Sequence, residues 1–342
     1  MKYRQLGHSG LTVSELCLGT MTFGSNFYNI GEVDQPGADQ LVQRALDAGI
    51  NFFDTADVYS FGESEQVLGR ALKNANVDRD EIVIATKVRN PMSKAAGAGT
   101  GDINNRGLSR KHIRASIHAS LKRLGTDHID LYQVHGWDQS TPMEETLRAL
   151  DDLVREGKVL YLGCSNWTAR HLAQALTLSD ANGWSRFISL QAYYALAGRD
   201  LEHELYPLAD EQGLGIMPWS PLAGGFLSGK FRRDQAAPEG SRRTDFDFPP
   251  VDRERVFDAV DVMETIAGET NATIPQIALA WLLAKSAVSS VIVGAKRLDQ
   301  LDDNLKAVDV ALTDDQMTRL DAVTAPRAMY PAWIVERQNA VR

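Results

Sequence analysis

Four side chains in this sequence, Asp54, Tyr59, Lys87 and His135, are of the types that together could deliver a proton to an oxygen atom. Asp54, Lys87 and His135 come directly after short apolar runs that predict β-strands, and Tyr59 follows shortly after Asp54. The phenol of Tyr59 is protonated at neutral pH because its unperturbed pKa is about 10. A neighbouring Lys87 ammonium would stabilise the phenolate and make Tyr59 a better acid, while Asp54 would hold Lys87 in place.

A neutral His135 would complete this set by donating a hydrogen bond to a carbonyl oxygen and orienting it. The chemistry that suits the set is carbonyl reduction, in which the oxygen gains negative charge as the carbon receives a hydride. We find no activated serine or cysteine nucleophile and no cluster of metal ligands, so we expect no metal centre. Each residue alone also has a structural explanation, such as a helix cap or a packed side chain. Their shared position at strand ends favours the catalytic interpretation.

Short apolar runs alternate with segments of helical periodicity along most of the chain. The spacing of Ala38, Leu41 and Ala45, for example, is typical of an amphipathic helix. Eight parallel strands with crossover helices close a (β/α)8 TIM barrel, and such a barrel would bring the polar strand ends to one rim. The eight predicted strands cover residues 16–19, 50–53, 82–85, 129–134, 159–163, 187–190, 215–217 and 291–293.

An open, doubly wound sheet is the alternative architecture. No G-x-G-x-x-G motif follows a predicted strand, and no linker divides the chain, which favours the barrel. Residues 224–230 spell G-x-x-x-x-G-K, but Phe231 follows where a phosphate-binding loop of that type needs Ser or Thr. We therefore predict a single domain over residues 1–342. It begins with a β-hairpin whose first strand covers residues 3–6 and whose second strand starts at Val13. Long loops at residues 95–107, rich in Gly, Ala and Asn, and 224–250 would lie on the C-terminal face, where barrel enzymes build active sites.

The composition indicates a globular protein. Of 342 residues, 44% are hydrophobic and 24% are charged, which excludes a disordered chain. No apolar run reaches the roughly 18 residues of a membrane-spanning helix, and no secretory signal is visible, so we expect a cytoplasmic location. Cys17 and Cys164 are too few for a disulfide framework. The net charge of −9 argues against nucleic acid or an anionic membrane as a partner.

The chain resembles the aldo-keto reductases, NAD(P)H-dependent oxidoreductases built on a (β/α)8 barrel. Residues 49–59, Gly-Ile-Asn-Phe-Phe-Asp-Thr-Ala-Asp-Val-Tyr, are similar to the family's first signature, and the similarity extends over residues 6–304. The Asp, Tyr, Lys and His of the family's catalytic tetrad fall on Asp54, Tyr59, Lys87 and His135. The resemblance implies that an aldehyde or ketone is reduced to the alcohol by hydride transfer, with Tyr59 as the proton donor.

The resemblance also implies where the cofactor binds. Ser165, Asn166 and Gln191 match residues that hold the nicotinamide carboxamide, and Trp219 matches an aromatic residue that stacks on the nicotinamide ring. Lys230 would close over the pyrophosphate. The predicted cofactor-binding residues are Gly19, Thr20, Met21, Asp54, Ser165, Asn166, Gln191, Trp219, Ser220, Pro221, Leu222, Gly224, Lys230, Gly294, Lys296, Arg297, Gln300 and Asn304.

Lys296 and Arg297 would pair with a 2′-phosphate, which favours NADPH as the cofactor and leaves NADH possible. The hydrophobic pattern of this chain most resembles that of the aldo-keto reductase branch that includes the β-subunits of voltage-gated potassium channels. The alternative function is therefore a cofactor-bound regulatory or binding subunit with little turnover. His135 favours the reductase, because channel subunits that resemble this sequence typically lack the tetrad histidine.

The expected partner is a small-molecule carbonyl substrate, and a homo-oligomer is possible. We expect the pocket rim to come from residues 21–27, Tyr28, Trp137, the loop 95–107 and the C-terminal residues 329–333. Aromatic side chains in these segments favour an apolar or ring-shaped carbonyl compound. The fold alone does not choose among substrates.

Overall fold

The computed structural model describes residues 1–25, 27, 32–233, 235, 243 and 246–341. Within these residues, eight parallel strands form one sheet in the order β10-β3-β4-β5-β6-β7-β8-β9. The strands are β3 (Leu16–Gly19), β4 (Phe52–Asp54), β5 (Val83–Val88), β6 (Ile129–Val134), β7 (Val159–Ser165), β8 (Phe187–Tyr193), β9 (Gly215–Trp219) and β10 (Val291–Gly294).

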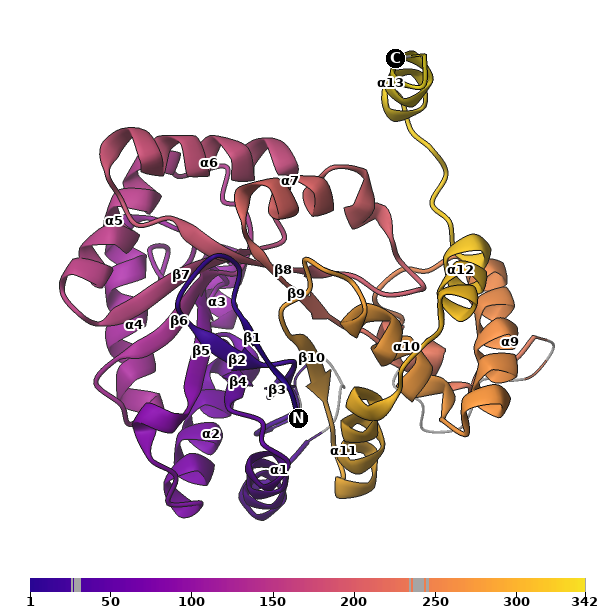
Figure 1. The fold of residues 1–342 in the computed structure, drawn as a ribbon. Coiled ribbons are helices and arrows are strands. Elements are labelled where there is room, and N and C mark those ends of the chain that lie inside the picture. Colours follow the sequence, from indigo (N-terminus) through magenta and orange to yellow (C-terminus); the bar gives the residue numbers. More distant parts are fainter. Residues whose placement is uncertain (26, 28–31, 234, 236–242, 244–245, 342) are drawn as a thin grey trace.

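The sheet closes on itself between β9 and the residues just before β10. Ile216 forms a parallel bridge with Val288. The amide nitrogen of Ile216 donates to the carbonyl oxygen of Ala287 at 2.8 Å, and its own carbonyl oxygen accepts from the amide of Ser289 at 3.0 Å. A closed sheet leaves no strand edge open to another chain. The predicted (β/α)8 barrel is confirmed by this closure and by the helices that surround the strands (Figure 1).

The predicted N-terminal hairpin is also present. Strands β1 (Tyr3–Gln5) and β2 (Thr12–Ser14) pair antiparallel. The amide of Gly7 donates to Ser289 Oγ at 3.3 Å, so the hairpin turn lies at the end of the barrel where β10 begins. Leu6 is fully buried and packs with the side chains inside the barrel. The hairpin therefore plugs the N-terminal end and leaves the opposite end of the barrel for a site.

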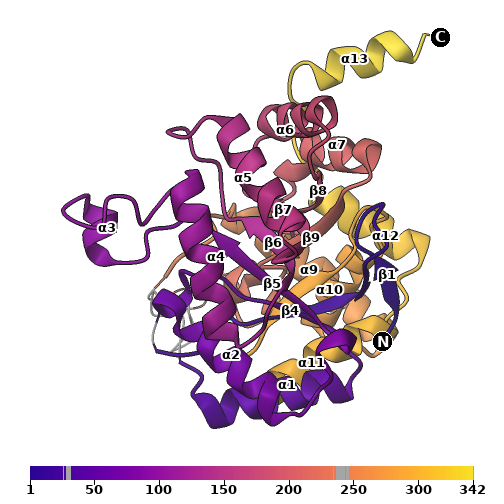
Figure 2. The same ribbon diagram turned by 90° about the vertical axis from the view of Figure 1, so that its left-hand side faces the viewer.

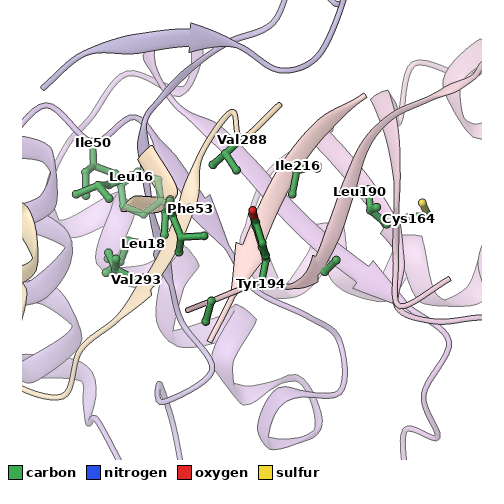
Figure 3. Packing of buried hydrophobic residues seen from close by; sticks show 14 of the residues in the cluster. Leu16, Leu18, Ile50, Phe53, Cys164, Leu190, Tyr194, Ile216, Val288 and Val293 are labelled. Atoms are coloured by element: carbon green, nitrogen blue, oxygen red, sulfur yellow. The ribbon is translucent and has the colours of Figure 1, made fainter. Parts of the chain in front are cut away.

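The core has two layers because successive side chains of a strand point to opposite faces. In β3, Leu16 and Leu18 pack outward against the helices, while Cys17 packs inward. In β4, Phe53 points outward and Phe52 inward. Figure 3 shows Leu16, Leu18 and Phe53 gathered in the outer layer. Burial of such side chains is worth roughly 1.5–3 kcal/mol each relative to an exposed position.

Most of the helices between and after the strands cover the outside of the barrel (Figures 1 and 2). The helix α1 buries Ala38, Leu41 and Ala45, as its sequence spacing predicts. Asp34 caps its N-terminus, and the Asp34 side chain accepts from the amide of Gly37. The helices are α1 (Gln35–Asp47), α2 (Glu63–Asn74), α3 (Lys94–Ala98), α4 (Arg110–Leu124), α5 (Met143–Arg155), α6 (Ala169–Asn182), α7 (Leu205–Gln212), α9 (Arg253–Thr270), α10 (Ile274–Leu283), α11 (Leu298–Leu305), α12 (Asp314–Val323) and α13 (Ala332–Asn339).

Two local expectations are wrong. Lys87 does not follow its strand but lies inside it, since β5 continues to Val88. The segment 95–107 is not loop throughout, because α3 covers Lys94–Ala98. Ser93 caps this helix, and its side chain accepts from the amide of Ala96. The expected loop 224–250 begins with a short 3-10 segment, η4 (Ala223–Ser228), and α9 starts after Asp252.

The C-terminal residues 329–333 do not form the pocket rim. They are absent from the described lining of the large cavity at the barrel mouth, and Tyr330 is 76% exposed. Figures 1 and 2 both show α13 standing away from the barrel. Trp137 and Phe27 do line the cavity, whereas Tyr28 lies outside the described residues. Among the described helices, none combines the length and the apolar composition that crossing a membrane requires.

Candidate active site

Lys87 lies at the centre of the four residues that the sequence singled out. Its buried ammonium donates to Asp54 Oδ2 at 2.5 Å, to the carbonyl oxygen of Thr55 at 2.9 Å and to Tyr59 Oη at 3.3 Å. These acceptors match the three hydrogens of the ammonium group. The side chain of Lys87 is 0% exposed, so its charge is balanced by Asp54 and not by water. The structure thus brings Asp54, Tyr59 and Lys87 into direct contact.

Asp54 is held by two further donors from neighbouring strands. Nε2 of Gln133 and Nε2 of Gln191 donate to Asp54 Oδ1 at 3.0 and 2.9 Å. Gln191 also donates to Gln133 Oε1 at 3.2 Å. Because Lys87 binds the other oxygen, both carboxylate oxygens have partners, which offsets the cost of burying the charge. Gln191, which the family resemblance assigned to the cofactor, therefore also supports Asp54.

Tyr59 begins η1 (Tyr59–Gly62), a short 3-10 segment that follows β4. The Nζ atom of Lys87 lies 4.9 Å from the centre of the phenol ring. The imidazole ring of His135 lies 5.7 Å from the same ring, edge-on at 79°. Tyr59 is therefore packed against both the ammonium and the imidazole, and it lines the cavity described below.

Burial and charge set the protonation states of these groups. Lys87 lowers the pKa of Tyr59, as expected, but burial raises it by more, so the pKa lies above 10.0. Burial lowers the pKa of Lys87, but Asp54 and Tyr59 raise it by more, which keeps the ammonium charged. Burial, Lys87 and Arg89 together hold the pKa of His135 well below 6.5. Tyr59 is thus protonated and His135 neutral at neutral pH.

His135 follows directly after β6, as predicted. Its amide donates to the carbonyl oxygen of Val88 at 2.9 Å, and its carbonyl oxygen accepts from Asn166 Nδ2 at 3.2 Å. Nδ2 of Asn90 lies 3.2 Å from His135 Nδ1. Both its backbone and its ring are therefore fixed by hydrogen bonds.

A cavity of about 1550 Å³ runs over the C-terminal ends of the strands. Asp54, Tyr59 and His135 line it, whereas the fully buried Lys87 is not part of the lining. Every residue that the sequence assigned to the cofactor also lines this one cavity: Gly19, Thr20, Met21, Asp54, Ser165, Asn166, Gln191, Trp219, Ser220, Pro221, Leu222, Gly224, Lys230, Gly294, Lys296, Arg297, Gln300 and Asn304.

Asn166 connects three parts of the cavity wall near Tyr59. Its Nδ2 atom donates to Ser165 Oγ at 2.9 Å, and its Oδ1 atom accepts from the indole nitrogen of Trp219 at 3.1 Å. The ring of Phe248 stacks on Trp219 with the ring centres 5.7 Å apart and the planes at 8°. The orientation of the indole is therefore fixed by one hydrogen bond and one stacked ring.

The turn after β9 brings backbone close to the same cavity. Gly224 and Gly225 have positive φ angles of 64° and 96°, which glycine adopts without strain. A Cβ atom on Gly224 would lie 2.7 Å from the carbonyl oxygen of Phe248. The tight turn therefore requires glycine at position 224, and Lys230 follows it as an exposed side chain at the cavity.

The residues predicted to bind a 2′-phosphate, Lys296 and Arg297, also line the cavity. The guanidinium of Arg297 binds the carboxylate of Asp299 through two hydrogen bonds of 2.9 Å, and both side chains are mostly exposed. The amide of Lys296 donates to Gln300 Oε1 at 2.9 Å. Asn304 is buried. Arg297 would have to exchange Asp299 for a phosphate.

The sequence interpretation missed several residues of this site. Gln133 is a polar side chain inside an otherwise apolar strand, and alternation with Leu131 would have placed it inside the barrel. Asn90 and Phe248 lie in segments without regular structure, and no local pattern connects them to His135 or Trp219. In the described part of the chain, no group of three or more His, Cys, Asp or Glu residues is placed to hold a metal ion.

The fold and the site are those of a barrel oxidoreductase. Residues 15–325 match the Aldo/keto reductase family, and the chain belongs to this family. Members of the family generally use NAD(P)H. The membership agrees with the resemblance that the sequence motifs carry.

Curated relatives cover nearly the whole chain. A versiconal hemiacetal acetate reductase of Aspergillus parasiticus is 35% identical over 97% of this chain and 99% of its own. An uncharacterized oxidoreductase of Bacillus subtilis (strain 168) is 36% identical over 94% and 96%. A probable voltage-gated potassium channel subunit beta of Arabidopsis thaliana is 37% identical over 97% and 99%. The similarity therefore extends to proteins named as reductases and to proteins named as channel subunits.

Proposed function

We propose that this protein is an NADPH-dependent carbonyl reductase that converts an aldehyde or ketone to the alcohol. The observation that carries the proposal is the Lys87 ammonium, which contacts both Asp54 and the Tyr59 hydroxyl at the wall of a large cavity. The Tyr59 hydroxyl and the neutral His135 imidazole at the cavity wall would meet the carbonyl oxygen, and the buried Lys87 cation would act on it through Tyr59. Relatives named as oxidoreductases support the same reaction class.

Each residue of the set has a distinct role in the proposed reaction. His135 donates a hydrogen bond to the carbonyl oxygen and orients it. Tyr59 gives its proton to that oxygen as it gains negative charge, and an alkoxide is basic enough to take it even though burial raises the pKa of Tyr59. Lys87 stabilises the resulting phenolate, and Asp54 keeps Lys87 in place.

The donor set of the cavity fits a nicotinamide dinucleotide phosphate. The bound cofactor would supply the hydride that the carbonyl carbon accepts. Ser165 and Asn166 offer hydroxyl and amide groups to the cavity that Tyr59 also lines, and Trp219 offers a flat ring. Lys230 and Lys296 would provide positive charge for the phosphates, with Lys296 at the 2′-phosphate. Trp219 and Lys296 line one continuous cavity, as an extended dinucleotide requires.

An activity screen tests this function. NADPH consumption is followed with a panel of apolar, aromatic and small polar aldehydes and ketones, while NADPH binding is measured by quenching of tryptophan fluorescence. We expect turnover of at least one class of carbonyl compound. Tight NADPH binding without turnover of any compound would contradict the proposal. That result would favour a cofactor-bound binding subunit, the second candidate, which the similarity to potassium channel β-subunits supports.

A further inference from the structure

The imidazole ring of His135 has a neighbour that determines which nitrogen carries its proton. Nδ1 of His135 lies 3.2 Å from Nδ2 of Asn90. An amide nitrogen can donate a hydrogen bond but cannot accept one. Nδ1 of His135 must therefore be the acceptor in this contact. In a neutral imidazole the proton is then on Nε2.

The direction of the Asn90 amide is itself fixed by Arg89. Nη1 of Arg89 lies 3.2 Å from Asn90 Oδ1, and a guanidinium group can only donate. Reversing the amide would place its NH2 group against the guanidinium, so that two donors would face each other. Arg89 is anchored in turn, because its Nη2 atom donates to the carbonyl oxygen of Trp137 at 3.1 Å. The hydrogen bonds thus run in one direction, from Arg89 to Asn90 to His135.

The surroundings of the ring agree with a single neutral tautomer. Burial and the charges of Lys87 and Arg89 disfavour a second proton on His135. The backbone of His135 is held at both its amide and its carbonyl group, by Val88 and Asn166. The ring therefore has little freedom to turn and exchange its two nitrogens.

We infer that Asn90, oriented by Arg89, is a positioning residue that selects the Nε2–H tautomer of His135. This inference rests on the proposed function, in which the Nε2–H group donates to the carbonyl oxygen of the substrate. With the opposite tautomer, Nε2 would present a lone pair to that oxygen and repel it. Asn90 would then influence the reaction through His135.

The substitution Asn90→Asp tests the inference, because a carboxylate can only accept and so requires a proton on Nδ1. Nitrogen-15 NMR of histidine-labelled protein distinguishes protonated from unprotonated ring nitrogens. The signals of His135, one of seven histidines, are identified by their loss in His135→Gln. We expect the Nε2–H form in the parent protein and a protonated Nδ1 in Asn90→Asp. Asn104→Asp, which adds the same charge at an exposed position of the neighbouring loop, should keep the parent tautomer.

The kinetic expectation is a fall in kcat of about 10-fold or more in Asn90→Asp, within the range for a misplaced acid–base group, with the Kd for NADPH unchanged. An unchanged tautomer in Asn90→Asp would overturn the inference, and so would a changed tautomer with unchanged kcat. If Asn90→Asp does not fold, Asn90→Ala serves in its place and should show both tautomers, whereas a pure Nε2–H form would overturn the inference. The tautomer is measured without turnover, so a protein that reduces no carbonyl contradicts the proposed function separately.

Discussion

The ammonium of Lys87 lies 2.5 Å from the carboxylate of Asp54, and both side chains are shielded from solvent. Breaking such a buried pair leaves an uncompensated charge in the barrel. The pair therefore contributes to the stability of the fold as well as to the proposed chemistry, and the two contributions can be separated by mutation.

Lys87→Met should lower the free energy of unfolding by about 3–5 kcal/mol and abolish carbonyl reduction, because it leaves Asp54 buried without its cation. Asp54→Asn combined with Lys87→Met removes both charges and should recover more than half of that stability without recovering activity. Urea unfolding and NADPH consumption measure the two effects. As a control, Lys285→Met breaks the more exposed pair with Asp321 and should cost at most about 1 kcal/mol. Full stability in Lys87→Met would contradict the structural role.

The pH dependence of reduction follows from the directions in which the pKa values of His135 and Tyr59 are shifted. The pKa of His135 is lowered below 6.5, so the ring gains a proton only in acid. The pKa of Tyr59 is raised above 10.0, so its proton is lost only in strong base. We expect kcat for reduction to stay flat through neutral pH, between those two limits. A titration of kcat centred near neutral pH would be inconsistent with these protonation states.

His112 gives a prediction about stability. His112 is a buried residue of α4, and its burial lowers the pKa of the ring from 6.5 to about 4. As pH falls from 6.5 to about 4, the unfolded chain takes up a proton that the folded chain does not, so stability decreases. The loss is at most about 3 kcal/mol. His112→Leu should flatten this part of the curve of unfolding free energy against pH, and an unchanged slope would assign the loss to other groups.

The choice of cofactor should depend on Lys296. Lys296→Ala is expected to raise the KM for NADPH about 10-fold or more while changing the KM for NADH little, because only NADPH carries the 2′-phosphate. Equal changes in both KM values would show that Lys296 does not read the 2′-phosphate.

The sequence predicted the barrel and the strand-end positions of Asp54 and His135 because both follow from short-range patterns. Asp54 and His135 stand where apolar strands end, and parallel strands of a barrel end at one rim. Asn90, Gln133 and Phe248 escaped prediction because their roles depend on neighbours from other strands and loops.

The orientation of the C-terminal segment could not be predicted either. The aromatic residues at 329–333 favoured a place at the pocket, but α13 buries none of its residues. The raised pKa of Tyr59 was also missed. Burial of the phenol causes it, and that burial depends on the residues of the whole barrel.

In the proposed reaction, Tyr59 donates the proton to the carbonyl oxygen. Its most direct test is a single-turnover measurement, in which the preformed complex with NADPH is mixed with a carbonyl compound found in the screen. Tyr59→Phe should slow NADPH oxidation by about 10²–10⁴-fold with an unchanged Kd for NADPH. Tyr330→Phe, the same change in the exposed tail, should not differ from the parent protein. Equal rates in Tyr59→Phe and the parent would contradict the account.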